Sequence, residues 1–377
     1  MMPQAMFDDP DGMLAMLRES AAGFTAQHSG TKSLRDKRAS AGDLDKQAWK
    51  AMAEAGWTGL LLPEGLGGAG LGMREQAVLS EALGRALIAE PVAMAAVFSG
   101  ALLANVSVSE ERTRLCAGIA DSSVIAVPAW QNPSKSSHAR PVVATATAGG
   151  FALTGEKHFV DAARSATDFL VVADCSEGCL LLSVPAASAG VTINERPGID
   201  GAMIASLTFA GCEVPESLVL ARAESADALL ESPILHARLA LAAELAGIAS
   251  RALEITIGYT KDRVQFGKPI ASFQAIQHRL VDMWSDAEFA CAAVVNAVET
   301  LDAGDVRAAR LAVLAAKARA GDAAVSICRR TLHLHGAMGF TDECDIGLYL
   351  KRAINLNATL GQSEALRLQF VELERAA

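Results

Sequence analysis

The sequence predicts a mainly helical protein with a central β domain, and three observations indicate this fold. The composition is 51% hydrophobic but only 5% aromatic, which suits packed helices better than an all-β or a disordered chain. Apolar residues recur at three- and four-residue spacing towards both ends of the chain. Short β-branched runs fill the middle. We therefore expect three domains, at residues 1–120, 121–222 and 223–377.

Residues 1–120 are expected to form an N-terminal helical domain. Helical spacing runs through Leu44–Trp57 and Glu75–Leu103, and the glycine-rich segment Leu62–Gly72 separates them. Glycine permits positive φ and close backbone approach, as phosphate-binding loops require. However, no Lys-Ser/Thr pair follows the segment and no strand clearly precedes it. We interpret it as a structural turn, with a phosphate loop as the alternative.

Residues 121–222 are expected to form a compact β domain. No helical run of crossover length separates its strands, so the sheet is predicted to be antiparallel rather than doubly wound. The predicted strands are Ser123–Val127, Val142–Thr147, Phe151–Thr154, Phe169–Ala173, Leu180–Val184, Val191–Asn194 and Ser206–Phe209.

Residues 223–377 carry long helical patterns that predict a four-helix bundle. Leu235–Tyr259, Phe273–Ala303 and Val306–His333 each exceed the usual length of a globular helix. The connection Gly267–Ile270 ends the first of these helices, because glycine frees φ and proline removes a backbone donor.

Charge and cysteine usage narrow the class of protein. A net charge of −10 and a pI near 5.3 argue against binding to nucleic acid or to an anionic membrane surface. No apolar stretch reaches the roughly 18 residues that a membrane span needs. Seven scattered cysteines, and a start without a signal-peptide pattern, predict a reduced, cytoplasmic protein. Cys175 and Cys179 are close, but no second ligand pair at zinc spacing accompanies them, so no metal site is expected.

Four segments carry a resemblance to a known family. The strongest is the run YTKDRVQFGKPIASFQAIQH, which spans residues 259–278. Supporting segments are Leu62-Pro63-Glu64 with its glycines, Leu153–Lys157 and Leu334–Thr341. Together with the order helices, β domain, helical bundle, they resemble the acyl-CoA dehydrogenase family over nearly the whole chain.

The resemblance implies a flavoprotein that removes two hydrogens from Cα and Cβ of an acyl-CoA. It implies FAD bound across a subunit contact, in a homo-oligomer or a heterotetramer with a related subunit, and electron-transfer flavoprotein as the electron acceptor. The planar donors of Arg263 suit a pyrophosphate, and the alternative for this residue is an exposed salt bridge. The resemblance also places Gln265, Phe266, Phe273 and Gln274 beside the flavin nucleotide.

The turn after residue 332 resembles the family loop that approaches the adenosine side of a neighbouring subunit's FAD. His333, His335, Gly336 and Ala337 are its candidate cofactor contacts. The family usually has Gln in place of His333 and Gly in place of Ala337, which changes the hydrogen bonding and adds Cβ bulk. The two histidines could also be ordinary capping or core residues. They do not share a helix face, so a metal pair is not expected.

In the β domain, Phe159-Val160-Asp161 matches a family element, usually Trp-Ile-Thr or Trp-Ile-Ser, that packs against the isoalloxazine. Phe159 can still cover a ring face, and Val160 follows it as a further candidate contact. Asp161 replaces a neutral hydroxyl, so its charge should oppose flavin reduction. The segment Val127–Pro133 departs from the family's Thr-Glu-Pro element, which weakens the expectation of FAD contact and of the usual electron route there.

The family's chemistry needs a carboxylate that removes the Cα proton while hydride leaves Cβ for the flavin. The usual base position near the C-terminus holds Leu360 here. The alternative position, just before Arg238 on the first bundle helix, holds Ala237. Arg238 matches an arginine that organises the family's active site, so we assign it a catalytic role.

Glu244 is the remaining acid in this apolar stretch of helix, about 10 Å along the axis from Ala237 and on nearly the same face. Three interpretations stay open for it: a base for a differently bound substrate, a polar group that recognises the far end of an acyl chain, and a structural acid paired with Arg or Lys. A buried carboxylate needs a partner or a raised pKa in each case.

The run Gly339–Ala353 resembles small subunits of bacterial heteromeric acyl-CoA dehydrogenases, which act on dicarboxyl, steroid side-chain or other bulky acyl-CoAs. One subunit of such pairs can lack the base. The leading hypothesis is therefore an FAD-dependent acyl-CoA dehydrogenase or its small subunit. The alternative is a non-catalytic partner that completes the FAD site of another chain, and an acyl-CoA oxidase is a weaker possibility because such chains are usually longer.

Overall fold

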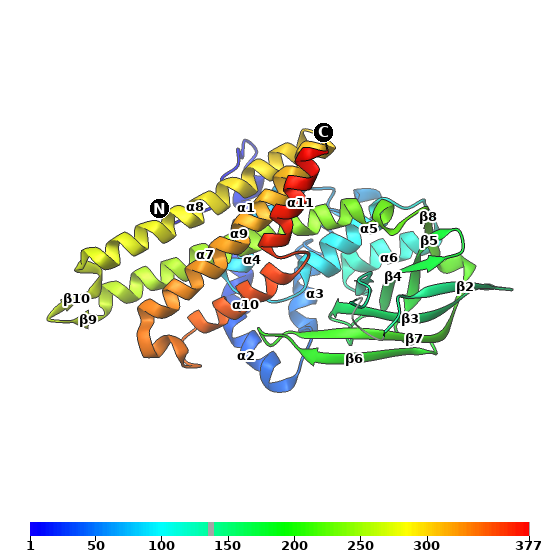
Figure 1. The fold of residues 1–377 in the computed structure, drawn as a ribbon, viewed down its shortest axis with the longest axis horizontal. Coiled ribbons are helices and arrows are strands. Elements are labelled where there is room, and N and C mark those ends of the chain that lie inside the picture. Colours follow the sequence, from blue (N-terminus) through cyan, green and yellow to red (C-terminus); the bar gives the residue numbers. More distant parts are fainter. Residues whose placement is uncertain (135–138, 377) are drawn as a thin grey trace. The chain divides into compact units, whose positions relative to one another are not determined.

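The computed structural model describes residues 1–134 and 139–376, which form two compact units interleaved along the sequence. Unit 1 comprises Met1–Arg35, Met73–Ala89 and Arg238–Ala377, and unit 2 comprises Asp36–Gly72 and Glu90–Ala237. The mainly helical fold with a central β-sheet is confirmed (Figure 1). The division into three domains stays a prediction.

Unit 1 is built from helices and one short hairpin. Figure 1 shows three long helices, α7 to α9, with the hairpin at one end of α7 and α8. These helices contain the three long runs expected from the sequence, and α9 packs against α8, α10 and α11, so the predicted helical bundle is confirmed. The elements with residues in this unit are α1 (Met13–Gln27), α2 (Gly30–Ser40), α4 (Met73–Arg85), α7 (Ala226–Asp262), β9 (Val264–Gln265), β10 (Lys268–Pro269), η4 (Ile270–Ser272), α8 (Gln274–Asp302), α9 (Val306–His335), η5 (Gly336–Phe340), α10 (Ile346–Ala358) and α11 (Ser363–Arg375).

The middle of α7 forms the core of unit 1. Apolar residues cover this part of the helix on all sides, which is typical of a helix surrounded by others. Glycines bring α4 and α7 into backbone contact: a Cβ on Gly84 would lie 2.1 Å from the carbonyl oxygen of Glu244, and one on Gly247 would lie 2.1 Å from that of Glu81. No larger residue fits at either position without moving a helix.

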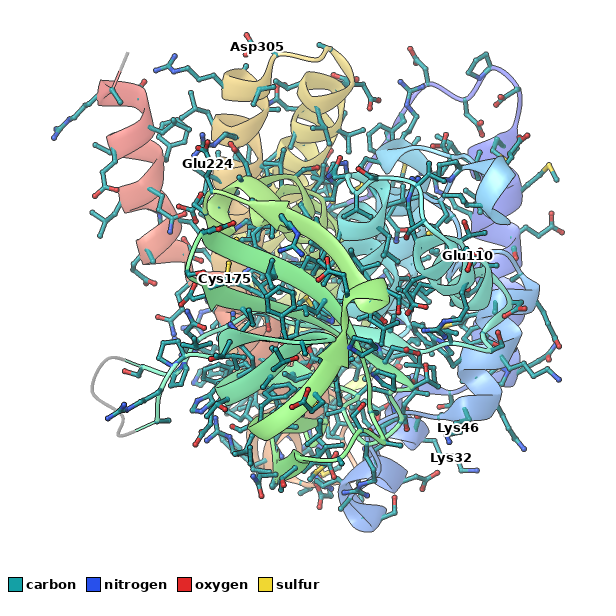
Figure 2. The ribbon with its side chains drawn as sticks, turned by 90° about the vertical axis from the view of Figure 1, so that its right-hand side faces the viewer. Lys32, Lys46, Glu110, Cys175, Glu224 and Asp305 are labelled. Carbon is teal, nitrogen blue, oxygen red and sulfur yellow. The ribbon has the colours of Figure 1, made fainter. Side chains whose placement is uncertain are left out.

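Local signals explain where several helices begin and end. Asp305, labelled in Figure 2, caps α9 by accepting a hydrogen bond from the backbone N–H of Ala308 at 3.0 Å. The stretch Glu75–Leu103, in which helical spacing was found, is divided in the structure among α4, η2 and α5. Helix α4 ends at Arg85 because Leu87 adopts a left-handed φ of 57°, and the N–H of the next residue, Ile88, donates back to the Leu83 carbonyl.

Unit 2 contains a mostly antiparallel sheet and the remaining helices. Figure 2 labels Cys175 at the end of β4 and Glu224 directly after β8. The strand order is β6-β7-β3-β2-β4-β5-β8, and β1 pairs with β4. Strand β8 was missed by sequence reasoning. The elements are α3 (Lys46–Glu54), η1 (Glu64–Leu66), η2 (Val92–Phe98), α5 (Ser99–Ala104), α6 (Glu110–Asp121), β1 (Ala126–Ala129), β2 (Val143–Thr147), β3 (Gly150–Asp161), β4 (Asp168–Cys175), β5 (Gly178–Pro185), β6 (Val191–Pro197), β7 (Met203–Pro215), η3 (Glu216–Leu218) and β8 (Val219–Ala223).

Two strand pairings correct the antiparallel prediction. Strand β1 pairs parallel with β4, and the single pairing of Val143 in β2 with Asp174 in β4 is also parallel. Parallel strands usually need a long crossover connection, most often a helix, and the sequence shows no such helix between these strands. Here the β2–β3 hairpin forms the connection between β1 and β4, so the chain returns in the same direction without a helix.

The glycine-rich segment Leu62–Gly72 forms a structural turn, as interpreted from the sequence. Its amides are used within unit 2: the N–H of Gly68 donates to the Pro63 carbonyl, that of Ala69 to Gly59 and that of Gly70 to Leu62. These donors are therefore not presented to a phosphate. Within residues 1–134 and 139–376, no helix combines the length and the apolar character that crossing a membrane requires.

Candidate functional site

The β9–β10 hairpin extends directly from the C-terminal end of α7. Its two-residue turn, Phe266-Gly267, has φ values of 54° and 77°, as a tight hairpin connection requires. Gln265 pairs with Lys268 across the hairpin. The Phe266 side chain is 92% exposed within the chain. A large apolar ring held this far from the core indicates a contact surface for another molecule.

The predicted nucleotide contacts gather on this hairpin. Among the residues that the structure describes, the Arg263 guanidinium has no carboxylate partner, so the salt-bridge alternative gains no support. Gln265 is exposed, and its side-chain amide donates to the carbonyl of Val264. The ring of Phe273 lies edge-on to Phe266, with centroids 6.2 Å apart, and Gln274 is exposed at the first residue of α8.

The turn at the end of α9 lies against the same end of α7. The His335 ring stacks on Tyr259 of α7 with centroids 4.2 Å apart, and the Tyr259 hydroxyl donates to the His335 carbonyl. The backbone N–H of Arg263 donates to the Tyr259 carbonyl. Tyr259 thus connects the hairpin to the predicted adenosine-side turn. Tyr259 lies in the run that carries the family resemblance, but the sequence alone indicates no role for it.

The individual residues of this turn differ in exposure. His335 is buried, and its Nδ1 lies 2.9 Å from the Thr331 carbonyl oxygen, so the ring has a structural role in α9. His333 is exposed near Arg279 of α8, with 3.4 Å between nitrogens. Gly336 has φ 61° and ends α9, and Ala337 is exposed after it. The exposed residues Gly336–Met338 are therefore accessible to a ligand.

In unit 2, Phe159 occupies an irregularity of β3. The register with β7 shifts between Lys157 and Val160, and Phe159 has φ 57°. Its ring is 51% exposed, and the guanidinium carbon of Arg196 lies 5.5 Å from the ring centroid. Val160, by contrast, is buried, so its predicted cofactor contact would have to come from the backbone. Arg196 was missed because cation–π pairs between separate strands leave no local sequence signal.

Lys157 holds in place the segment Val127–Pro133, which departs from the family's Thr-Glu-Pro element. Its Nζ donates to the Trp130 carbonyl at 3.1 Å and to the Asn132 side-chain oxygen at 2.6 Å. Burial lowers the pKa of Lys157 to about 8, because the charged form loses hydration. The Trp130 ring stacks on Phe98 with centroids 5.8 Å apart. This segment is therefore held by unit 2 itself.

Back in unit 1, Arg238 holds the turn that carries the family's usual base position. Its Nε donates to the Leu360 carbonyl at 2.9 Å, and Leu360 is buried with a left-handed φ of 57°. Burial, together with the nearby charge of Arg310, lowers the pKa of Arg238 to about 10. Ala237 is also buried. Neither position offers a group that can accept a proton.

Lys317 of α9 holds the same turn from another side. Its Nζ donates to the carbonyls of Asn357 and Gly361 at 3.0 and 3.1 Å, which are acceptors at and beyond the C-terminal end of α10. Burial and the charge of Arg238 lower the pKa of Lys317 to about 7. Sequence reasoning missed this residue, because a lysine in a long helix usually lies on its exposed face.

Glu244 forms a buried ion pair with Arg352 of α10. Its Oε1 accepts from Nε at 3.1 Å and from a terminal nitrogen at 2.8 Å, and both side chains are about nine-tenths buried. Of the three interpretations of Glu244, the paired structural acid is the one whose partner the structure provides. A role as base would require this pair to open.

Comparisons with known proteins give the family. Residues 13–123 match the acyl-CoA dehydrogenase N-terminal domain, and residues 228–372 match the C-terminal domain. Acyl-CoA dehydrogenase IpdE2 of Mycobacterium tuberculosis is 29% identical over 342 residues, covering 90% of each chain. The solved structure of the Tcur3481–Tcur3483 steroid ACAD, in a variant form, is 30% identical, with a TM-score of 0.84 over 96% of this chain and 98% of that one.

A third comparison concerns the fold alone. The ChsE4–ChsE5 complex of Mycobacterium tuberculosis has a TM-score of 0.88 at 23% identity, over 98% of this chain and 99% of that one. The two domain matches and the 30% identical structure, together with the arginine-bearing hairpin and the glycine-ended α9, lead to one conclusion: this chain belongs to the acyl-CoA dehydrogenase family.

Proposed function

We propose that this chain is an FAD-dependent acyl-CoA dehydrogenase that acts as one subunit of a heteromer with a related chain. One observation carries the proposal: the hairpin keeps an arginine without a carboxylate partner in the described chain, whereas both family positions for the base hold buried apolar residues, Leu360 and Ala237. Such a chain can contribute to a flavin site yet has no proton acceptor at either position. Pairing with a second subunit resolves this contrast.

The residues present fit the cofactor. Arg263, without a carboxylate partner in the described chain, provides bidentate donors for a pyrophosphate. The backbone from Gly336 can approach the adenosine side, and the exposed ring of Phe159 can cover the isoalloxazine. When bound, FAD supplies a hydride acceptor for the substrate Cβ.

In this proposal the chain's own residues position the backbone of the site and do not remove the Cα proton. Arg238 and Lys317 fix the Leu360–Gly361 turn through its carbonyl oxygens, which shapes the wall of the predicted substrate site. The Cα proton must go to a carboxylate that is neither at position 360 nor at position 237. We assign that carboxylate to the related subunit's own active site, which leaves this chain's site without a base, and Glu244 to the ion pair with Arg352.

The proposed partners follow from the resemblance and from the names of the similar proteins. The 30% identical structure is a steroid ACAD named by two components, which supports a related subunit as partner and a bulky acyl-CoA as substrate. Electron-transfer flavoprotein is the proposed electron acceptor, and the cytoplasm the proposed location. The alternative, a non-catalytic chain that completes the FAD site of another subunit, is favoured specifically by the pairing of Glu244.

Co-expression tests both functions. The chain is purified alone and together with a candidate related subunit, the absorbance spectrum is recorded, and a panel of acyl-CoAs is added. We expect flavin absorbance and acyl-CoA-dependent bleaching with the pair. Bleaching by the chain alone would contradict the need for a second subunit. If the pair bleaches equally well after the Arg263→Ala change in this chain, the alternative role is excluded as well.

A further inference from the structure

Unit 1 contains a cavity of about 490 Å³ that no residue of the proposed flavin site lines. Its walls come from α1, the start of α2, α4, the C-terminal half of α7 and α10. The polar side chains include three arginines, Arg18, Arg85 and Arg251. Small apolar residues such as Ala82 and Ile255 form much of the remaining wall. A concave site with a few convergent charges and an apolar remainder is the usual form of a small-molecule site.

The positive charges of the three arginines are balanced by fewer carboxylate partners than there are guanidinium groups. Arg85 and Arg251 both donate to the same oxygen of Glu254, at 2.8 and 2.7 Å, so two cations share one anion. Arg18 donates from a terminal nitrogen to the Ala5 carbonyl. Its Nε is buried, with no hydrogen-bond partner within the described residues. A buried donor without an acceptor is costly, and an anionic ligand would satisfy it.

Glu81 is the buried acid of this cavity. Its side chain is 1% exposed, and one oxygen accepts from the Ala5 backbone N–H at 3.2 Å. The other oxygen is buried and has no partner in the part of the chain that is described. Burial raises the pKa of Glu81 to about 7, against the opposing effects of the Ala5 amide and of Arg85 and Arg18. Below pH 7 the carboxyl is therefore a donor rather than a charge.

Further charged and titratable side chains lie around Glu81 and the cavity. Asp345 lines the cavity and is paired with Arg35 at 2.7 Å, and the Tyr349 hydroxyl donates to the Arg85 carbonyl. Cys291 of α8 lies near enough to interact electrostatically with Glu81 and Glu288. Helix α2 begins at the cavity with Ser29 and Thr31 in its wall, next to Lys32, which Figure 2 labels, and a helix N-terminus favours negative charge.

We propose that this cavity binds a small organic carboxylate, with its charged group on Arg18 and its alkyl group against the apolar wall. The surplus of guanidinium groups supplies charge-assisted donors, and the protonated Glu81 supplies a neutral one. An ionised Glu81 would repel the same ligand. Binding therefore keeps Glu81 protonated, and the affinity falls as the pH rises above 7.

Isothermal titration calorimetry of the full chain tests this inference, with or without flavin, because the cavity lies apart from the proposed flavin contacts. Sodium butyrate is the probe, sodium chloride at equal ionic strength is the reference, and inorganic phosphate forms a second arm. We expect butyrate to bind at pH 6 and to bind about ten-fold more weakly at pH 8, where Glu81 is ionised. Titration in two buffers of different ionisation enthalpy should show uptake of up to one proton at pH 7.5.

Three variants localise the signal. Arg18→Gln should weaken butyrate binding at least ten-fold, whereas Arg375→Gln on the exposed end of α11 should not change it. Glu81→Gln should retain binding at pH 8 and lose the pH dependence, because an amide donates at every pH. No heat beyond the chloride reference at pH 6 would overturn the inference, as would binding by phosphate alone or equal binding by the Arg18 and Arg375 variants. The proton measurement needs only the unaltered chain, so it decides even if a variant fails to fold.

Discussion

The two ends of α7 in unit 1 differ in what their arginines contact. At the C-terminal end, Arg263 stands on an exposed hairpin without a carboxylate partner among the described residues. At the other end, Arg238 is half-buried and donates to the Leu360 carbonyl. A guanidinium of the first kind is available to a ligand, and one of the second kind is used to hold backbone in place. The predicted cofactor end is thus intact, while the predicted base end serves only to position a turn.

The largest effect is expected from restoring a carboxylate at the base position. In the flavin-bound heteromer, Leu360→Glu should raise acyl-CoA-dependent flavin reduction at this chain's site by about 100-fold or more, the usual worth of a positioned general base. Arg238, which donates to the carbonyl of the same residue, would help to keep the new group ionised. The rate is measured by stopped-flow absorbance of the flavin.

Leu360→Gln is the matched control, because it has the same size as glutamate and the same left-handed backbone but cannot accept a proton. A rate with glutamate that does not exceed the rate with glutamine would mean that position 360 is not aligned with a substrate, and the contrast between the two ends of α7 would lose its functional meaning.

Removing the charge of Glu244 should have a nearly equally large effect. This effect should be on the stability of the fold rather than on turnover. Glu244→Gln leaves Arg352 buried without its carboxylate, which typically costs about 3 kcal/mol of unfolding free energy. Urea unfolding measures this loss. The double variant Glu244→Gln, Arg352→Met should recover most of it. Turnover that falls far more than stability would restore Glu244 as a candidate base.

A smaller effect is expected at the ligand-facing end. Arg263→Ala should weaken FAD retention by about 10- to 100-fold, the range for charge-assisted hydrogen bonds to a phosphate group. Flavin fluorescence during dialysis or titration gives the dissociation constant. Lys261→Ala removes a neighbouring exposed cation of α7 and should leave the constant within two-fold. If both variants lose FAD affinity equally, Arg263 contributes only positive charge near the cofactor and makes no specific contact with it.

Elements with a local signal could be predicted from the sequence, and side-chain partners mostly could not. The three long helices and seven of the eight sheet strands follow from periodicity, whereas the parallel β1–β4 pairing depends on how a hairpin connects two strands. Helix α7 was predicted with Glu244 in an apolar stretch, yet its partner Arg352 lies 108 residues away. Such pairs are determined by packing between helices, which spacing within one helix cannot reveal.

Lys317 illustrates the same limit, because its sequence position revealed neither its burial nor its contacts. The lysine lies in a predicted helix, and the structure buries it fully between carbonyl acceptors of a turn that begins 40 residues later. Its desolvation follows from helices α9 and α10 packing together. The turn was identified from the sequence only by what it lacks, a glutamate at position 360.

Counted for one pH unit, the smallest of the four effects is a pH dependence that separates the anchored turn from the exposed hairpin. The folded pKa of Lys317, about 7, lies below its ordinary value of 10.5. Between these values Lys317 binds one more proton in the unfolded chain than in the folded chain, so this residue makes stability rise with pH by about 1.4 kcal/mol per pH unit. Lys317→Met should remove this contribution, as measured by urea unfolding at pH 7, 8 and 9, and should leave the rise that the lowered pKa of Lys157 adds above pH 8. Lys50→Met, on an exposed part of α3, should keep the contribution of Lys317. If all three proteins show the same slope, the pKa of Lys317 is not lowered by folding. Its side chain then remains a charged ammonium group that anchors the turn through its two carbonyl contacts.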